Sequence, residues 1–170
     1  MPDSEFRQLA PHELDSGYAV YMSAFEWLNA RGIRQWLVPL PHSVYAARQA
    51  RGENYGLFVN DQLAVIVSLN SGTPPEWADV LTESETGWVH TLAIRSDYRG
   101  RGLGALTLQH SVSHLRDQGL PEVYLDCLAG VLPAYYASQG FTQLAAKDYT
   151  YPSGNTSFPI VLMKKDLRDA

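Results

Sequence analysis

The segment "YRGRGLGALTL", Tyr98–Leu108, is a glycine-rich turn between two regular elements. The apolar run "WVHTLAI" (Trp88–Ile94) before it predicts a strand, and the run after it predicts a helix that ends at Gly119. The first turn of a helix has unpaired N–H groups and a partial positive charge. Glycines let such a backbone approach a ligand closely, and Arg99 and Arg101 add positive charge. The turn is therefore predicted to bind a phosphate or pyrophosphate group.

Two nucleotide-binding motifs compete for this turn. A Walker A loop is excluded, because no Gly-Lys-Ser/Thr follows the glycines. A dinucleotide-binding turn fits the spacing Gly100-x-Gly102-x-x-Ala105, and Asp126 ends the next strand, where an acid would bind the ribose. Its surroundings do not fit, because the chain shows one strand–helix–strand unit and two arginines crowd the turn. A dinucleotide-dependent oxidoreductase is therefore the less favoured alternative.

The rest of the chain predicts an α+β fold with a mostly antiparallel sheet of about six or seven strands, flanked by helices. Asn60-Asp61 reads as the turn of a β-hairpin, and Ser43 reads as the N-cap of a helix. The segment Ser71–Gly87 is polar and contains prolines, so we expect a long surface loop there. The predicted strands are Glu5–Pro11, Tyr55–Val59, Leu63–Leu69, Trp88–Ile94, Glu122–Ala129, Phe141–Lys147 and Phe158–Lys165; the predicted helices are His12–Ile33, Val44–Arg51, Leu103–Gly119 and Leu132–Gly140.

Composition limits the class of protein. The 170 residues favour one domain over 1–170, and 45% apolar residues suffice for one core. A net charge of −5 argues against a nucleic-acid partner. The single cysteine, Cys127, suits a reducing cytoplasm, and the opening residues lack the pattern of a signal peptide. No apolar run is long enough to cross a bilayer, so no membrane association is expected.

A second motif lies downstream of the turn. The pattern Arg99-x-x-Gly102-x-Gly104 resembles the acetyl-CoA pyrophosphate loop of the GNAT N-acetyltransferase superfamily, and Tyr136 precedes Gly140-Phe141 as a tyrosine does in that family. The resemblance covers Trp88–Leu144 and implies a GNAT-like fold. It also implies transfer of an acetyl group from acetyl-CoA to a primary amine of a small molecule or peptide, by direct attack in a ternary complex. Homodimers are frequent in the family, which implies one here by analogy.

The resemblance also identifies the residues that hold acetyl-CoA. The strand backbone is implied to pair with the pantetheine arm, and the turn is implied to bind the pyrophosphate. Many members carry an asparagine where this chain has Ala129 or Gly130, so one contact to coenzyme A differs. The implied cofactor-binding residues are Leu92, Ala93, Ile94, Arg99, Gly100, Arg101, Gly102, Leu103, Gly104 and Ala105.

Two side chains are candidates for acid–base chemistry. Tyr136 is implied to be the general acid that protonates the departing sulfur, and its spacing to Gly140 favours it over Tyr135. A tyrosine packed in the core is the competing interpretation. His90 is the candidate base, against a structural histidine or a chain of waters. Strand alternation places it on one face with Leu92.

No metal site is expected. His110 and His114 are spaced as metal ligands on a helix would be, but the sequence shows no third ligand near them. A solvated helix face is the favoured interpretation of this pair.

The sequence gives weaker signals for the residues that bind the acceptor amine. The candidate substrate-binding residues are Trp27, Trp36, Trp77 and Asp126, and the loop before Trp88 adds the acids Glu76, Asp79, Glu83 and Glu85. Aromatic rings with acids suit an organic cation. The competing interpretation is that the tryptophans fill the core and the acids face solvent. A non-catalytic acyl-CoA-binding domain is the remaining functional alternative.

Overall fold

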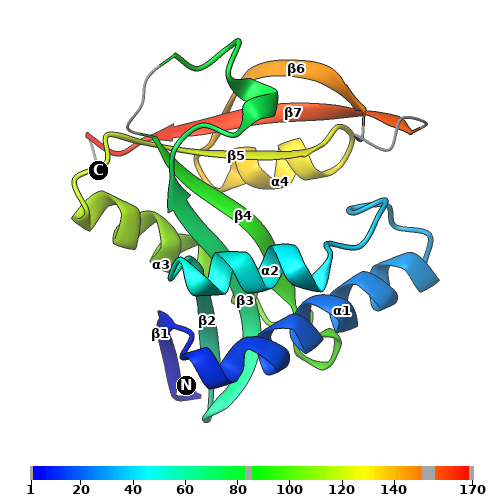
Figure 1. The fold of residues 1–170 in the computed structure, drawn as a ribbon, viewed down its shortest axis with the longest axis vertical. Helices are drawn as coiled ribbons and strands as arrows, with labels where there is room; N and C mark the ends of the chain where they lie inside the picture. The colour runs from blue at the N-terminus through cyan, green and yellow to red at the C-terminus, as the bar shows by residue number, and fades with distance from the viewer. Residues whose placement is uncertain (1, 83–85, 151–155, 169–170) are drawn as a thin grey trace. The chain divides into compact units, whose positions relative to one another are not determined.

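The computed structural model describes residues 2–82, 86–150 and 156–168. Its seven strands form one sheet in the order β1-β2-β3-β4-β5-β7-β6, accompanied by four α-helices (Figure 1). Strands β4 and β5 pair in parallel, whereas β1–β2, β2–β3, β5–β7 and β6–β7 pair antiparallel. The predicted α+β class and the mostly antiparallel sheet are therefore confirmed. None of the helices described is long and apolar enough to cross a membrane.

The chain divides into two compact units. The first unit contains Met1–Leu69 and His90–Ser111, and the second contains Asn70–Val89 and Val112–Ala170. Strand β4 (Gly87–Ile94) and helix α3 (Leu103–Asp117) contribute residues to both. Each unit has its own core, and each contains some of the residues predicted to form the site.

The first unit is built around the predicted hairpin. Asn60 and Asp61 both have positive φ, 48° and 63°, as the tight turn between β2 and β3 requires. The predicted cap at Ser43 is wrong, because the extended residue Pro41 precedes the first helical residue and α2 begins one residue before the serine. The elements of this unit are β1 (Ser4–Gln8), η1 (Pro11–Glu13), α1 (Leu14–Ala30), α2 (His42–Ala50), β2 (Asn54–Val59), most of β3 (Gln62–Ser71), the end of β4, η3 (Ser96–Tyr98) and the start of α3.

Apolar clusters of described residues line both faces of the strands of the first unit. Helices α1 and α2 cover a cluster that includes Tyr21, Tyr45 and Ala93. Leu103 at the start of α3 covers the other cluster, against which Leu92 packs. The end of β4 is thus held from both sides.

In the second unit, a cluster of described residues surrounds two buried tryptophans, Trp77 and Trp88. The prediction of a surface loop over Ser71–Gly87 is wrong at Trp77, which has no exposed surface, because its large ring packs into this core. The elements are η2 (Pro75–Trp77), the start of β4, the end of α3, β5 (Glu122–Leu128), α4 (Leu132–Ser138), β6 (Thr142–Thr150) and β7 (Ser157–Asp166).

Helix α3 presents its apolar side as predicted at Leu108, Val112 and Leu115, which are buried. Ala105 is only half-buried, which differs from the prediction. Thr107 is buried on this side of the helix instead. Its hydroxyl can be buried because it donates a hydrogen bond to the Leu103 carbonyl.

Candidate active site

Strand β4 is distorted beside His90. Thr91 has a φ of +51°, which a β-branched residue adopts only under strain. Arg48 reaches from α2 and donates from Nη1 to the Thr91 hydroxyl oxygen, at 2.8 Å. The regular alternation predicted for this strand is therefore wrong at Thr91. Leu92 packs into the cluster beneath α3, whereas the charges that shift the pKa of His90 belong to Arg48 and Glu53.

His90 is half-buried in this distorted stretch. Burial, and to a lesser extent the Arg48 cation, lower its pKa to about 4, against the opposing effect of the Glu53 carboxylate. The imidazole is therefore neutral near pH 7. A neutral imidazole can accept a proton. Because the pKa of His90 is low, its protonated form then loses that proton readily to water.

The glycine turn opens α3 in the same unit. Gly100 and Gly102 have φ values of 77° and 72°, which only glycine adopts readily, and the space beside their Cα atoms is open. The first helical hydrogen bond runs from the Leu106 N–H to the Gly102 carbonyl, at 3.2 Å. The N–H groups of Leu103, Gly104 and Ala105 precede that bond, at the positive end of the helix. This donor set fits a pyrophosphate.

Arginines surround the turn. The Arg99 guanidinium lies over the Trp27 ring at 4.2 Å, and Arg31 lies over the same ring at 3.9 Å. Burial and repulsion from Arg31 lower the pKa of Arg99. Among the residues described, no carboxylate forms an ion pair with Arg31 or Arg99. The Trp27 ring thus contacts two guanidinium groups that no described carboxylate pairs with, one of them from the glycine turn.

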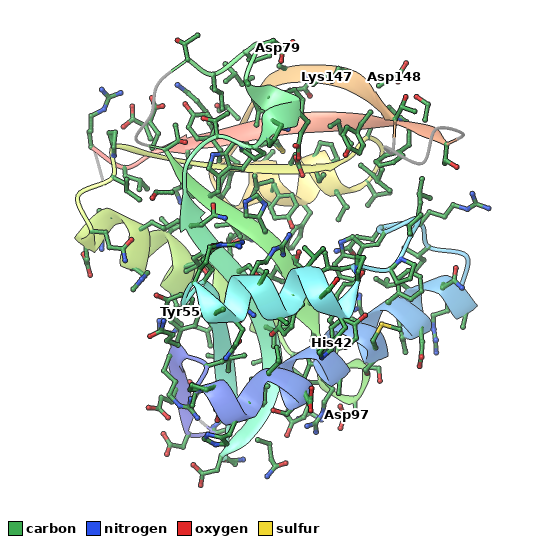
Figure 2. The ribbon with its side chains drawn as sticks, in the orientation of Figure 1. His42, Tyr55, Asp79, Asp97, Lys147 and Asp148 are labelled. Atoms are coloured by element: carbon green, nitrogen blue, oxygen red, sulfur yellow. The ribbon has the colours of Figure 1, made fainter. Side chains whose placement is uncertain are left out.

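The other arginine of the turn contacts the segment before it. Arg101 donates to the Asp97 carbonyl at 3.2 Å and lies over the Tyr98 ring at 4.8 Å. Asp97 itself forms a bidentate pair with Arg95, at 2.6 and 2.8 Å, and Figure 2 labels it beside the segment that leads into the turn. These contacts hold η3 and fix where the turn begins.

Trp36 lies apart from the turn in the same unit. It packs against the cluster under α1 and α2, with its ring 5.1 Å from that of Tyr21. It is half-buried, so part of the ring faces solvent.

Tyr136 lies on α4 in the second unit. Its ring packs edge-on against Phe141 at 6.1 Å and against Tyr135 at 5.2 Å. Burial raises the pKa of Tyr136, and the negative charges of Cys127 and Asp126, when ionised, raise it further. The phenol therefore keeps its proton at physiological pH, as a general acid must.

Asp126 and Trp77 meet in the same unit, although 49 positions separate them in the sequence. The Trp77 indole N–H donates to Asp126 Oδ2 at 2.8 Å. Lys147 lies over the Trp77 ring at 4.6 Å and pairs with Asp79 at 2.9 Å, and Figure 2 shows these last two side chains together. Of the other predicted acids of this loop, Glu83 and Glu85 lie outside the described residues.

The remaining candidates have ordinary contacts. His110 is exposed and stacks on Phe6 at 5.3 Å, and His114 hydrogen-bonds Gln118 at 3.0 Å. Burial raises the pKa of Cys127 to about 12, so its thiol stays protonated. Within the described ranges, no three His, Cys, Asp or Glu side chains converge as metal ligands would.

Three cations at these sites were missed by sequence reasoning: Arg31, Arg48 and Lys147. Arg31 carried a signal, since it follows Trp27 by one helical turn. Arg48 and Lys147 carried none, because their partners are distant in sequence.

Comparison with known proteins gives a family match for most of the chain. The model of the acetyltransferase (GNAT) family matches residues 17–141. The chain is 28% identical over 131 residues to the uncharacterized N-acetyltransferase YesJ of Bacillus subtilis. The match covers 71% of this chain and 72% of YesJ.

Solved structures share the fold. A GNAT-family acetyltransferase from Listeria monocytogenes superposes with a TM-score of 0.80 and 17% identity, over 96% of this chain and 94% of that one. The ribosomal-protein-S18-alanine N-acetyltransferase of Escherichia coli superposes with a TM-score of 0.70 and 18% identity, over 97% and 94%.

Proposed function

Because the chain belongs to the acetyltransferase (GNAT) family, we propose that it transfers the acetyl group of acetyl-CoA to a primary amine of a small molecule or peptide, by direct attack in a ternary complex. The observation that carries the proposal is the turn at Gly100 and Gly102, whose left-handed glycines open a helix beside arginines. The reducing cytoplasm that a single cysteine suits is the proposed location.

The donor side follows from the first unit. The N–H groups at the start of α3 bind the pyrophosphate, and Arg99 and Arg101 contribute charge. The β4 backbone from Leu92 to Ile94 would hold the pantetheine arm, and an N–H group of this backbone would polarise the thioester carbonyl. When bound, acetyl-CoA would supply the acetyl group as a thioester, and coenzyme A would be released as the free thiol once the acetyl group has passed to the amine.

Two side chains are proposed for the proton transfers. Neutral His90 accepts the proton that the acceptor nitrogen loses as it is acylated, directly or through water. Tyr136 supplies a proton to the departing sulfur, and its raised pKa keeps that proton in place until the sulfur carries negative charge.

A screen of amines for thiol release tests the proposal, after thermal shifts with acetyl-CoA, coenzyme A and NAD. We expect both coenzyme A species to stabilise the protein and at least one amine to release thiol. Tyr136→Phe should lower kcat by about 100-fold and change the Kd for acetyl-CoA little, since it removes one proton donor. Tyr135→Phe is the matched control and should keep its activity.

Three outcomes contradict parts of the proposal. Stabilisation by NAD and not by coenzyme A would favour the dinucleotide alternative. Coenzyme A binding without thiol release from any amine would favour a binding domain. Full activity of Tyr136→Phe would remove this tyrosine from the mechanism.

A further inference from the structure

We propose that the acceptor amine carries a carboxylate and that Arg48 binds this carboxylate, so that the acceptor is an amino acid rather than a simple amine or a peptide. The inference rests on the proposed acetyl transfer, because it names the substrate class of that reaction. Arg48 and the end of β4 from His90 onward both belong to the first compact unit.

The Arg48 guanidinium uses one side for contacts within the protein and leaves the other side open. Its Nη1 donates to the Thr91 hydroxyl oxygen at 2.8 Å and to the Ser68 hydroxyl oxygen at 3.4 Å. Its Nε and Nη2 donate to no group among the residues described, and neither is among the side-chain atoms that are shut off from solvent. The edge formed by Nε and Nη2 can hold both oxygens of a carboxylate through two parallel hydrogen bonds.

This guanidinium has no counter-ion in the described part of the chain, where no carboxylate lies within ion-pair distance of it. Glu53 is close enough to affect Arg48, but its two oxygens accept from Arg51 Nε at 3.1 and 2.9 Å. Burial lowers the pKa of Arg48, which the Glu53 carboxylate opposes and the Arg51 cation adds to. A charge withdrawn from water is costly without a partner, so a bound anion would be stabilised here.

The charges around Arg48 favour a singly charged anion. Glu53 and Arg51 offset each other as an ion pair, and His90 is neutral near pH 7 because its pKa is lowered to about 4. The positive charge of Arg48 itself is therefore what remains. A doubly charged phosphate would be repelled by Glu53, whereas a carboxylate matches the guanidinium in charge and in its planar pair of oxygens.

Arg48 reaches the part of β4 that the proposed reaction uses. Thr91 lies between His90, the proposed base, and Leu92, whose backbone would hold the pantetheine arm. The Arg48 charge also lowers the pKa of His90, so the guanidinium lies close to the imidazole. A carboxylate on Arg48 would thus be near the amine that His90 deprotonates, as in an acceptor whose two groups are few bonds apart.

An amino acid and its α-amide form a matched pair of acceptors, because the amide keeps the amine and the side chain but lacks the charge. We would measure kcat/KM for thiol release, with saturating acetyl-CoA, for the standard protein amino acids and their α-amides. The amine of the amide is the less basic of the two, so a larger fraction of it is neutral near pH 7. A preference for the acid must therefore come from the protein.

We expect kcat/KM for at least one acid to exceed that for its amide by roughly tenfold to 100-fold, as a hydrogen bond to a charged group contributes. Arg48→Gln, which can still donate to Thr91, should remove this preference. Arg34→Gln, the same change at an exposed position of the same unit, should keep it. Arg48→Lys keeps the charge but not the fork, so it should retain part of the preference, and it provides the comparison if melting shows that Arg48→Gln is unfolded.

Calorimetric titration with N-acetyl amino acids separates carboxylate binding from acetyl transfer. The probes are N-acetyl-L-alanine, N-acetyl-L-leucine and N-acetyl-L-phenylalanine, each beside its amide, with and without coenzyme A. We expect at least one acid to bind more tightly than its amide, and Arg48→Gln to abolish the difference. If thiol release fails with every amine while this difference persists, acetyl transfer is refuted and the Arg48 site is not.

Equal kcat/KM for every acid and its amide would overturn the inference, as would titrations in which no acid binds better than its amide under either condition. An equal loss of rate for acid and amide in Arg48→Gln would also contradict it, because that result would mean that Arg48 only holds β4 at Thr91. The ratio between acid and amide is therefore the decisive readout, since a purely structural role would leave it unchanged.

Discussion

Trp27 is a single side chain with an arginine guanidinium from each of two elements on its ring. Arg31 comes from the end of α1 and Arg99 from the glycine turn, at 3.9 and 4.2 Å. The sequence shows the first contact, because the two residues are one helical turn apart. It cannot show the second, which depends on the folding of the whole unit.

Loss of the Trp27 ring should weaken the binding of acetyl-CoA. We expect Trp27→Leu to raise the Kd by about 3-fold to 5-fold, since one cation–π contact at a partly exposed site contributes about 0.5–1 kcal/mol. Calorimetric titration with acetyl-CoA measures the change. Arg34→Ala, an exposed cation close in sequence, is the control; an equal loss there would show that the effect is general charge.

At the scale of elements, strand β4 differs most from its sequence. The run Trp88–Ile94 predicts a regular strand, and its ends agree closely with the structure. Nothing in it marks Thr91 as left-handed, because threonine disfavours that conformation and its stabilising partner, Arg48, lies on α2. By contrast, the tight turn at Asn60 and Asp61 is encoded locally and was predicted correctly.

Thr91 provides a test of backbone strain. Glycine is normally less stable than alanine within a strand, by about 0.5–1 kcal/mol. At a φ of +51° the order should reverse, so Thr91→Gly should be more stable to urea than Thr91→Ala by about 1 kcal/mol. Ala146→Gly in β6 is the control and should be destabilising. The usual order at Thr91 would mean that the strain is absent.

At the scale of the whole molecule, the class of fold was predictable from the sequence. The distribution of the candidate site residues over two compact units was not. Periodicity and turn residues predicted the seven strands, because those signals are local. The pairing of Trp77 with Asp126 was invisible, since a buried tryptophan inside a polar segment has no periodic signal. The same holds for the charges around His90, which come from Arg48 and Glu53.

The low pKa of His90 should affect the stability of the folded chain. An unfolded histidine binds a proton below about pH 6.5, whereas His90 in the fold does so only near pH 4. Its contribution is therefore complete above pH 6.5 and is lost as the pH falls from 6.5 to 4, by at most about 3 kcal/mol.

Urea unfolding across this range measures the effect. His90→Gln should show a shallower loss of stability than the wild type as the pH falls, whereas His12→Gln, at an exposed position, should follow the wild type. Parallel curves for wild type and His90→Gln would mean that His90 titrates normally.

Calorimetric titration of coenzyme A into the protein tests the identity of the anion at the glycine turn. We predict one binding site, no heat with NAD, and at least a tenfold loss of affinity in Gly102→Val, because valine disfavours a φ of 72°. Arg99→Ala, which leaves the backbone unaltered, should weaken binding as well. Binding of NAD in place of coenzyme A, or wild-type affinity in both variants, would contradict the assignment of this turn to acetyl-CoA.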